Sequence, residues 1–224
     1  MPAPSRPFTA RNVQFARAVL AAVAALMVTF SPDHSAAVGL SVFGGFAIVT
    51  AVVLGLAAGL VYPSGRRWPA VLMAAIALAA GMAGSVPSWR TEDLLFVLVI
   101  SWALLSGLVE LLAGIRYRRE EGARDAITIG ALTIALGVAL LLIPSGFVQP
   151  YVIEKAGSFE LTGIILGVGI FGGYAAIVAV FLGIAALTPR ATAAASSTVA
   201  DADNPTDPVT QSDRVTDADR GGRA

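Results

Sequence analysis

Residues 104 to 122 read LLSGLVELLAGIRYRREEG, an apolar run that ends in a cluster of arginines. Residues 104 to 115 are the second half of an apolar segment at about 94 to 115. As a helix, this segment is long enough to cross ~30 Å of hydrocarbon. Its one acidic side chain is Glu110, six residues before Arg116. A long apolar helix followed by a basic turn is typical of a transmembrane span, so this stretch predicts a membrane protein.

The composition of the whole chain supports the same class. Hydrophobic residues make up 56% of the 224 residues, charged residues 13%, and the mean hydropathy is +0.77, whereas a soluble domain carries about 25% charged residues. The sequence has no cysteine and one histidine, His34. Disulfides, thiol catalysis and zinc sites built from cysteine and histidine are therefore excluded.

Six apolar runs are long enough to span a bilayer, and we expect an all-α polytopic membrane protein with six transmembrane helices. The runs lie at about 13 to 31, 38 to 62, 69 to 87, 94 to 115, 126 to 144 and 161 to 188. Residues 1 to 12 precede this transmembrane domain of residues 13 to 188. Residues 189 to 224 contain too few large apolar residues to form a core, which predicts a disordered tail.

Arginine placement predicts the direction of the helices. The arginines cluster before the first run and in alternate loops, at Arg6, Arg11, Arg17, Arg66, Arg67, Arg116, Arg118, Arg119, Arg124 and Arg190. The remaining loops carry only Arg90 and Lys155 as basic residues. By the positive-inside rule, we expect a multi-pass membrane protein with both termini cytoplasmic. A cleaved signal peptide over residues 1 to 37 is the alternative, but this segment also fits an internal repeat.

That repeat has a period of about 56 residues. Arg11 lies 21 residues before Pro32, Arg67 lies 20 before Pro87, and Arg124 lies 20 before Pro144. We expect three helical-hairpin repeats, at about 11 to 65, 66 to 115 and 116 to 188, all with the same orientation. Chance spacing of hairpins in a compact six-helix protein is the alternative. Inverted repeats, which many secondary transporters contain, do not fit this pattern.

Residues 101 to 146, SWALLSGLVELLAGIRYRREEGARDAITIGALTIALGVALLLIPSG, combine a helix with a central glycine, a basic turn and the run IGALTIALGVALLLIP. In these features the segment resembles the HdeD-like family of acid-resistance membrane proteins, which are built from short hydrophobic repeats. The resemblance implies a bacterial inner-membrane protein linked to acid or stress tolerance. It implies no catalytic residues.

Several glycine pairs have the small-xxx-small spacing that lets membrane helices approach closely. They are Gly163 with Gly167, Gly169 with Gly173, and Gly55 with Gly59. We expect helix-packing faces there, which also makes a homo-oligomer possible. The sequence GVGIFGG at 167 to 173 satisfies G-x-G-x-x-G, but it lies inside one apolar run rather than between a strand and a helix, so no dinucleotide site is expected.

Two other residue types suggest environments rather than chemistry. The indoles of Trp68, Trp89 and Trp102 lie near predicted span ends, which suggests positions at the headgroup level. His34 lies in the outer SPDHS loop, where it either senses acid or is simply a solvated side chain beside Asp33; we favour the second interpretation.

Glu110 is the charge that composition does not explain. Helical spacing puts Ser106 and Gly107 one turn before it and Gly114 one turn after it, so it lies on a stripe of small residues that should face other helices. A lone carboxylate there would favour its neutral acid unless a cation approaches. Arg17 lies at a similar depth, ~9 Å into its span. We therefore predict an intramembrane ion pair between Arg17 and Glu110. The alternative is that a proton neutralises Glu110.

These features lead to two interpretations of function. In the favoured one, the protein is a non-enzymatic stress-tolerance membrane protein in which the pair fixes helix register. In the other, it is a small transporter or channel with Glu110 as a proton or ion site, served by the few polar groups within the spans, Thr50, Ser101, Ser106, Thr128 and Thr133. We expect the lipid bilayer as the partner of the chain. We expect no catalytic residues, cofactor, metal or nucleic-acid partner, and the sequence identifies no ligand.

Overall fold

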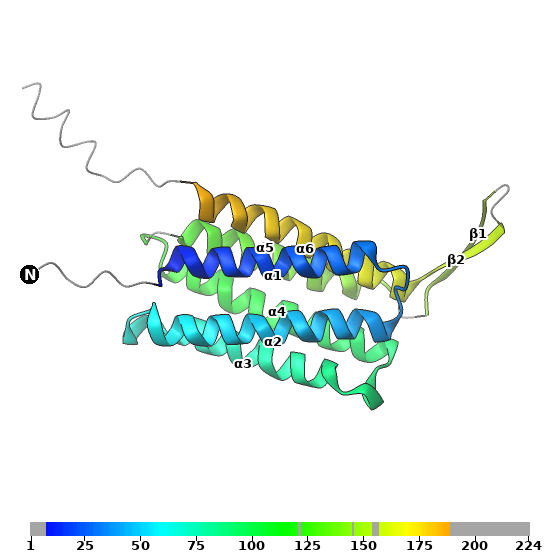
Figure 1. Cartoon of the computed structure of the whole chain (residues 1–224), viewed down its shortest axis with the longest axis horizontal. Helices are drawn as coiled ribbons and strands as arrows, with labels where there is room; N and C mark the ends of the chain where they lie inside the picture. The colour runs from blue at the N-terminus through cyan, green and yellow to red at the C-terminus, as the bar shows by residue number, and fades with distance from the viewer. Residues whose placement is uncertain (1–7, 121, 145, 154–156, 189–224) are drawn as a thin grey trace, which may run out of the picture. The chain divides into compact units, whose positions relative to one another are not determined.

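The structure is a computed structural model that describes residues 8–120, 122–144, 146–153 and 157–188 (Figure 1). Six of its helices are long and apolar enough to cross a membrane, which confirms the predicted polytopic helical class. The predicted tail, 189 to 224, lies outside the described residues, as do the first seven residues of the predicted N-terminal segment.

The predicted spans agree with the helices to within three residues at every boundary. The helices are α1 (Ala10–Phe30), α2 (Ala36–Leu60), α3 (Trp68–Ser85), α4 (Glu92–Arg116), α5 (Ala123–Leu141) and α6 (Gly163–Leu187), with short 3-10 turns at Ser64–Arg66 and Pro87–Trp89.

Hydroxyl side chains fix three of the helix starts. Thr9, Ser35 and Thr91 are the N-cap residues of α1, α2 and α4, and each side chain accepts a hydrogen bond from a first-turn backbone amide. In α4 the bond from the Leu94 amide to Thr91 is 3.2 Å long. Because the first amides of a helix have no partner within it, these caps satisfy polar groups where the chain enters the apolar segment.

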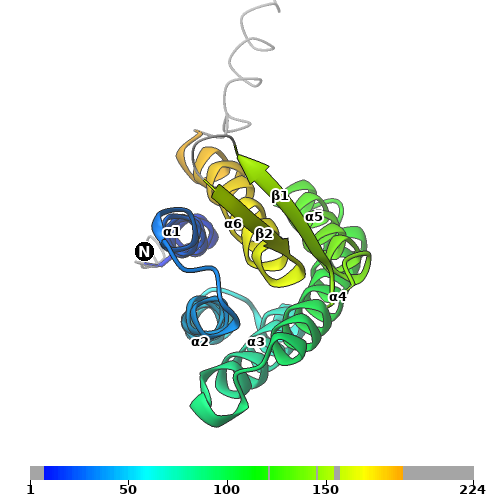
Figure 2. The same cartoon turned by 90° about the vertical axis from the view of Figure 1, so that its right-hand side faces the viewer.

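Viewed along their axes, the helices form a ring in which α1 and α6 close the circle (Figure 2). The most extensive contacts join α2 to α3, α4 to α5 and α6 to α1, whereas α1 with α2, α3 with α4, and α5 with α6 touch less. Each predicted repeat unit contains one of these less closely packed pairs. The three-repeat organisation stays a prediction, but two of the closely packed pairs, α2 with α3 and α4 with α5, are joined by the arginine-rich turns.

The two ends of the ring differ in chemistry. We call the end with the turns at 61–67 and 117–122 the basic end, because Arg66, Arg67, Arg118 and Arg119 lie there. At this end Arg11 donates hydrogen bonds to the carbonyls of Ala186 and Leu187, the latter at 3.1 Å. A guanidinium at the C-terminus of α6 also complements the helix dipole, so it joins the first helix to the last.

A β-hairpin, which the pattern of apolar runs did not predict, extends from the opposite end. Strands β1 (Val148–Ile153) and β2 (Gly157–Thr162) pair antiparallel, with Val148 opposite Thr162 (Figures 1 and 2). Their sequences, VQPYVI and GSFELT, contain the β-branched and aromatic residues that favour strands. The expectation of an all-α chain therefore holds for the spans but not for this connection.

Glycines bring the helices of the close pairs together backbone to backbone. A Cβ added at Gly130 of α5 would lie 2.5 Å from the Leu111 amide nitrogen of α4, and one added at Gly81 of α3 would lie 2.9 Å from the Ile48 amide nitrogen of α2. Neither contact leaves room for a side chain.

The glycines that have small-xxx-small spacing differ in their surroundings. Gly167 is buried and packs against Phe96, as predicted for a packing face. An added Cβ would meet nothing within 4 Å at four other positions, namely Gly55, Gly59, Gly169 and Gly173. Packing of these four within the chain was the wrong expectation, because they lie on outward faces of α2 and α6. A homo-oligomer through such faces stays a prediction.

Aromatic rings from α2, α4 and α6 fill the centre of the ring. Trp102 of α4 packs edge-on against Phe43 and Phe46 of α2, at 5.5 and 5.7 Å between ring centroids, and against Tyr174 of α6 at 6.2 Å. Trp102 is only 5% exposed. Its predicted position at the headgroup level is therefore wrong: Trp102 is a core residue, whereas Trp68 and Trp89 are exposed at helix ends.

We predict that Gly130→Ala destabilises the bundle by about 1–3 kcal/mol, because its methyl group forces α4 and α5 apart. The matched control is Gly169→Ala, also mid-helix but facing open space, which should leave stability unchanged or raise it by up to about 1 kcal/mol. Thermal unfolding in detergent ranks the two variants. Equal effects would contradict the backbone contact between α4 and α5.

Candidate functional site

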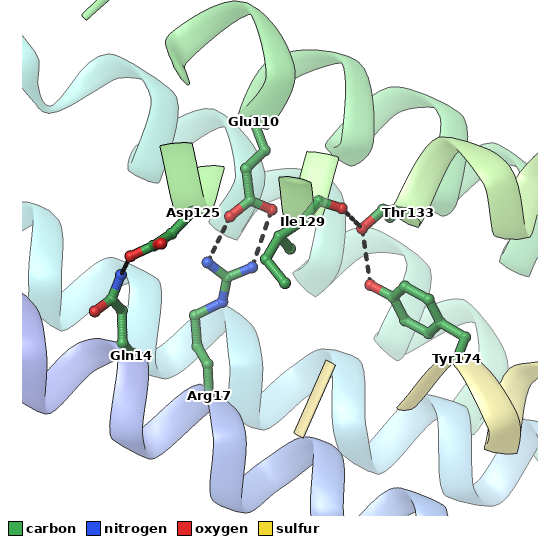
Figure 3. A network of polar contacts seen from close by, with 7 residues as sticks. All are labelled: Gln14, Arg17, Glu110, Asp125, Ile129, Thr133 and Tyr174. Atoms are coloured by element: carbon green, nitrogen blue, oxygen red, sulfur yellow. Dashed lines mark hydrogen bonds and ion pairs between the residues drawn. The ribbon is translucent and has the colours of Figure 1, made fainter. Parts of the chain in front are cut away.

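The structure brings together the two charged side chains that the sequence singled out. Arg17 of α1 and Glu110 of α4 face each other with both ends of the guanidinium on the carboxylate: Nη1 lies 2.6 Å from Oε1, and Nη2 lies 3.0 Å from Oε2 (Figure 3). The side chains are 18% and 9% exposed. Such a two-point, charge-assisted contact fixes the planes of both groups as well as their distance.

The stripe of small residues on α4 places Glu110 in this position. Ser106, Gly107 and Gly114 are buried with it on one face, as the helical spacing predicts. Ser106 donates its hydroxyl proton to the Trp102 carbonyl one turn earlier, which satisfies that hydroxyl within its own helix. Glu110 therefore points to the interior of the ring rather than to lipid.

A second polar link lies nearer the basic end. Gln14, one turn before Arg17 on α1, donates a hydrogen bond of 2.9 Å to Asp125 of α5 (Figure 3). Since α1 is not a ring neighbour of α4 or α5, these two bonds cross the interior of the bundle.

Tyr62 follows α2 at the same end of the ring. Burial raises the pKa of its phenol, Arg17 acts to lower it and Glu110 acts to raise it. Tyr62 is thus within electrostatic reach of both charges.

The third polar contact joins α5 to α6. The Thr133 hydroxyl lies 2.7 Å from the Ile129 carbonyl and 2.8 Å from the Tyr174 hydroxyl (Figure 3). Thr133 was among the polar residues expected within the spans, whereas Tyr174 was not. A signal was present, since FGGY at 171 to 174 matches FGGF at 43 to 46. The match indicates that Tyr174 occupies a core position resembling that of Phe46.

The Arg17–Glu110 pair and the Thr133–Tyr174 contact border one small cavity inside the ring. Its volume is about 20 Å³, enough for a single water molecule. Its polar lining consists of Arg17, Thr50, Ser106, Glu110, Thr133 and Tyr174, and Phe46 and Trp102 border it as well. Three of the five hydroxyl residues named from the sequence are thus brought to Glu110. Ser101 and Thr128 do not line the cavity.

The chemistry available at the cavity is hydrogen bonding and charge pairing. Within the described part of the chain, no group of three or more histidine, cysteine, aspartate or glutamate side chains is placed to hold a metal ion. His34 lies in the turn between α1 and α2 and does not line the cavity. Acid sensing by that histidine stays the less favoured of its two interpretations.

Comparison of the chain with protein-family models, with curated proteins and with solved structures finds no significant match. The HdeD-like resemblance of residues 101 to 146 stays a prediction from the sequence.

We predict that Arg17→Met destabilises the protein by about 3–5 kcal/mol, because it leaves Glu110 as a buried charge without a partner. The double variant Arg17→Met/Glu110→Leu removes both charges and should recover most of that loss. Thermal unfolding of the two variants and the wild type in the same detergent measures the recovery. A double variant as unstable as Arg17→Met would mean that the loss arises from packing rather than from the unpaired charge.

Proposed function

We propose that the chain is a non-enzymatic membrane protein of the bacterial inner membrane that serves acid or envelope stress tolerance. The resemblance of residues 101 to 146 to the HdeD-like family is the source of the physiological role. The six transmembrane helices and their buried ion pair are the structural basis of the proposal.

The observation that carries a non-enzymatic role is the closed contact between Arg17 and Glu110. Each charge already has its counter-charge, in a two-point geometry that leaves neither group as a free acid or base. The contact joins helices that are not neighbours in the ring, so its effect is to hold α1 and α4 in register. A catalytic site would need a nucleophile with a base, or a metal, beside a cavity that admits substrate.

We also propose that the basic end is cytoplasmic, which places the β-hairpin on the outer side of the inner membrane. The support is the concentration of arginines in the turns at the basic end.

The absence of natural cysteine makes this orientation directly testable. In intact cells, a membrane-impermeant maleimide should label Ser88→Cys, in the turn between α3 and α4, and leave Gly65→Cys, in the turn between α2 and α3, unlabelled. Both positions are exposed, so permeabilised cells should label both equally. Labelling of Gly65→Cys alone in intact cells would reverse the orientation.

A second candidate function is a small transporter or channel in which Glu110 is a proton or ion site. The observation that favours it is the cavity, because hydroxyl groups from α2, α4, α5 and α6 gather around the carboxylate. A pair that only fixes register would not need them.

Glu110→Gln separates the two candidates, because the amide keeps the size of the side chain but cannot carry the charge or the proton. Under the first proposal, proteoliposomes containing wild-type protein conduct protons within about twofold of empty liposomes, and Glu110→Gln changes acid survival only as far as it changes the amount of folded protein. Glu92→Gln, at the exposed start of α4, is the matched control. A proton flux well above this background, lost in folded Glu110→Gln, would support the transporter instead.

A further inference from the structure

One polar group at the cavity has no partner in the protein. The Thr50 side chain of α2 lines the cavity and is only 6% exposed, and its Oγ1 has no hydrogen-bond partner among the described residues. A buried hydroxyl that has left water and found no partner destabilises the fold. Native structures therefore nearly always satisfy such a group, with protein or with ordered water.

The other hydroxyls at the cavity have hydrogen-bond partners in the protein. Ser106 bonds to the Trp102 carbonyl, and Thr133 bonds to the Ile129 carbonyl and to Tyr174. Thr50 is the exception in this set. The cavity that Thr50 lines is the space in which a partner for this hydroxyl can lie.

The polar character of the cavity is not a requirement of packing. The inward-facing residues of α2, α4 and α6 follow one another with the same spacing. In this shared pattern, Leu54, Glu110 and Leu182 occupy equivalent positions. The two leucines are 4% and 1% exposed, so an apolar side chain fills this place well in two of the three helices. Likewise, Val178 of α6 takes the position that Thr50 holds in α2. Polar groups at these places serve the cavity.

The ligand that fits is defined by charge and by size. Arg17 and Glu110 neutralise one another, so the cavity attracts neither a cation nor an anion by net charge. Each carboxylate oxygen uses one of its lone pairs on the guanidinium and has another free to accept. A neutral molecule that both donates and accepts is required, and about 20 Å³ holds one molecule of water.

We propose that the cavity is a water-binding site, in which one ordered water links the Thr50 hydroxyl to the Arg17–Glu110 pair. The pair is then hydrated inside the bundle rather than dry. This site is independent of both candidate functions, because a bound water is compatible with a stability role and with proton transfer.

Radiolytic hydroxyl-radical labelling of the protein in lipid nanodiscs tests the site, because radicals formed from a bound water attack the side chains beside it. Phe46 lines the cavity, whereas Phe43 and Phe171 belong to the same aromatic cluster but do not line it. These three residues have the same intrinsic reactivity. We expect Phe46 to be labelled at least about fivefold faster than Phe43 and Phe171 in the wild type.

Thr50→Val removes the hydroxyl while keeping the shape, and it copies the residue at position 178. It should reduce Phe46 labelling to the rate of Phe43, while the outward-facing Met27 and Met82 keep their rates. Two results would overturn the proposal: equal labelling of the three phenylalanines in the wild type, or unchanged Phe46 labelling in folded Thr50→Val. Phe46 is half-buried whereas Phe43 and Phe171 are buried, so the substitution of Thr50 decides the test. Thr50→Ser, which keeps the hydroxyl, is the second variant: it should keep the wild-type Phe46 rate, and loss of that rate in folded Thr50→Ser would also overturn the proposal.

Discussion

A charged group inside hydrocarbon needs a counter-charge or hydrogen bonds, and this constraint organises the interior of the bundle. Glu110 meets it through Arg17, at 2.6 and 3.0 Å, and the two side chains come from helices on different parts of the ring. The ring must therefore be closed around the pair for both charges to be satisfied. Gln14 and Asp125 repeat this arrangement one turn nearer the basic end, so two polar contacts join α1 to helices that are not its neighbours in the ring.

The parts of the fold that could be predicted are those in which polar and apolar residues differ. The length of the apolar runs alone predicts the six spans. The similar depth of Arg17 and Glu110 could be predicted because both are charged residues in apolar helices. The core position of Trp102 and the outward faces of Gly55 and Gly169 could not be predicted. In a membrane, side chains facing lipid and side chains facing the core are equally apolar, so hydrophobic periodicity does not separate the two faces.

The glycines show the same limit from another side. Gly169 with Gly173 and Gly55 with Gly59 have the four-residue spacing of packing motifs, yet they face open space in the single chain, while Gly107 and Gly130 meet backbone to backbone. The spacing of the glycines indicates a helix face without side chains. It does not indicate whether another helix packs on that face, because this depends on which helices are adjacent in the ring. The β-hairpin is a similar case, since its strands pair only with each other and leave no trace in the apolar pattern.

The closing of the ring by α1 and α6 has a topological consequence. The first and last helices are close neighbours, and Arg11 bonds to the last carbonyls of α6. The described chain thus begins and ends at one place on the bundle, as in proteins that tolerate circular permutation. A short linker from α6 to α1 would make three covalent hairpins of the three closely packed pairs. The break in the chain could then be moved to the turn after α2 or after α4 with every interhelical contact kept.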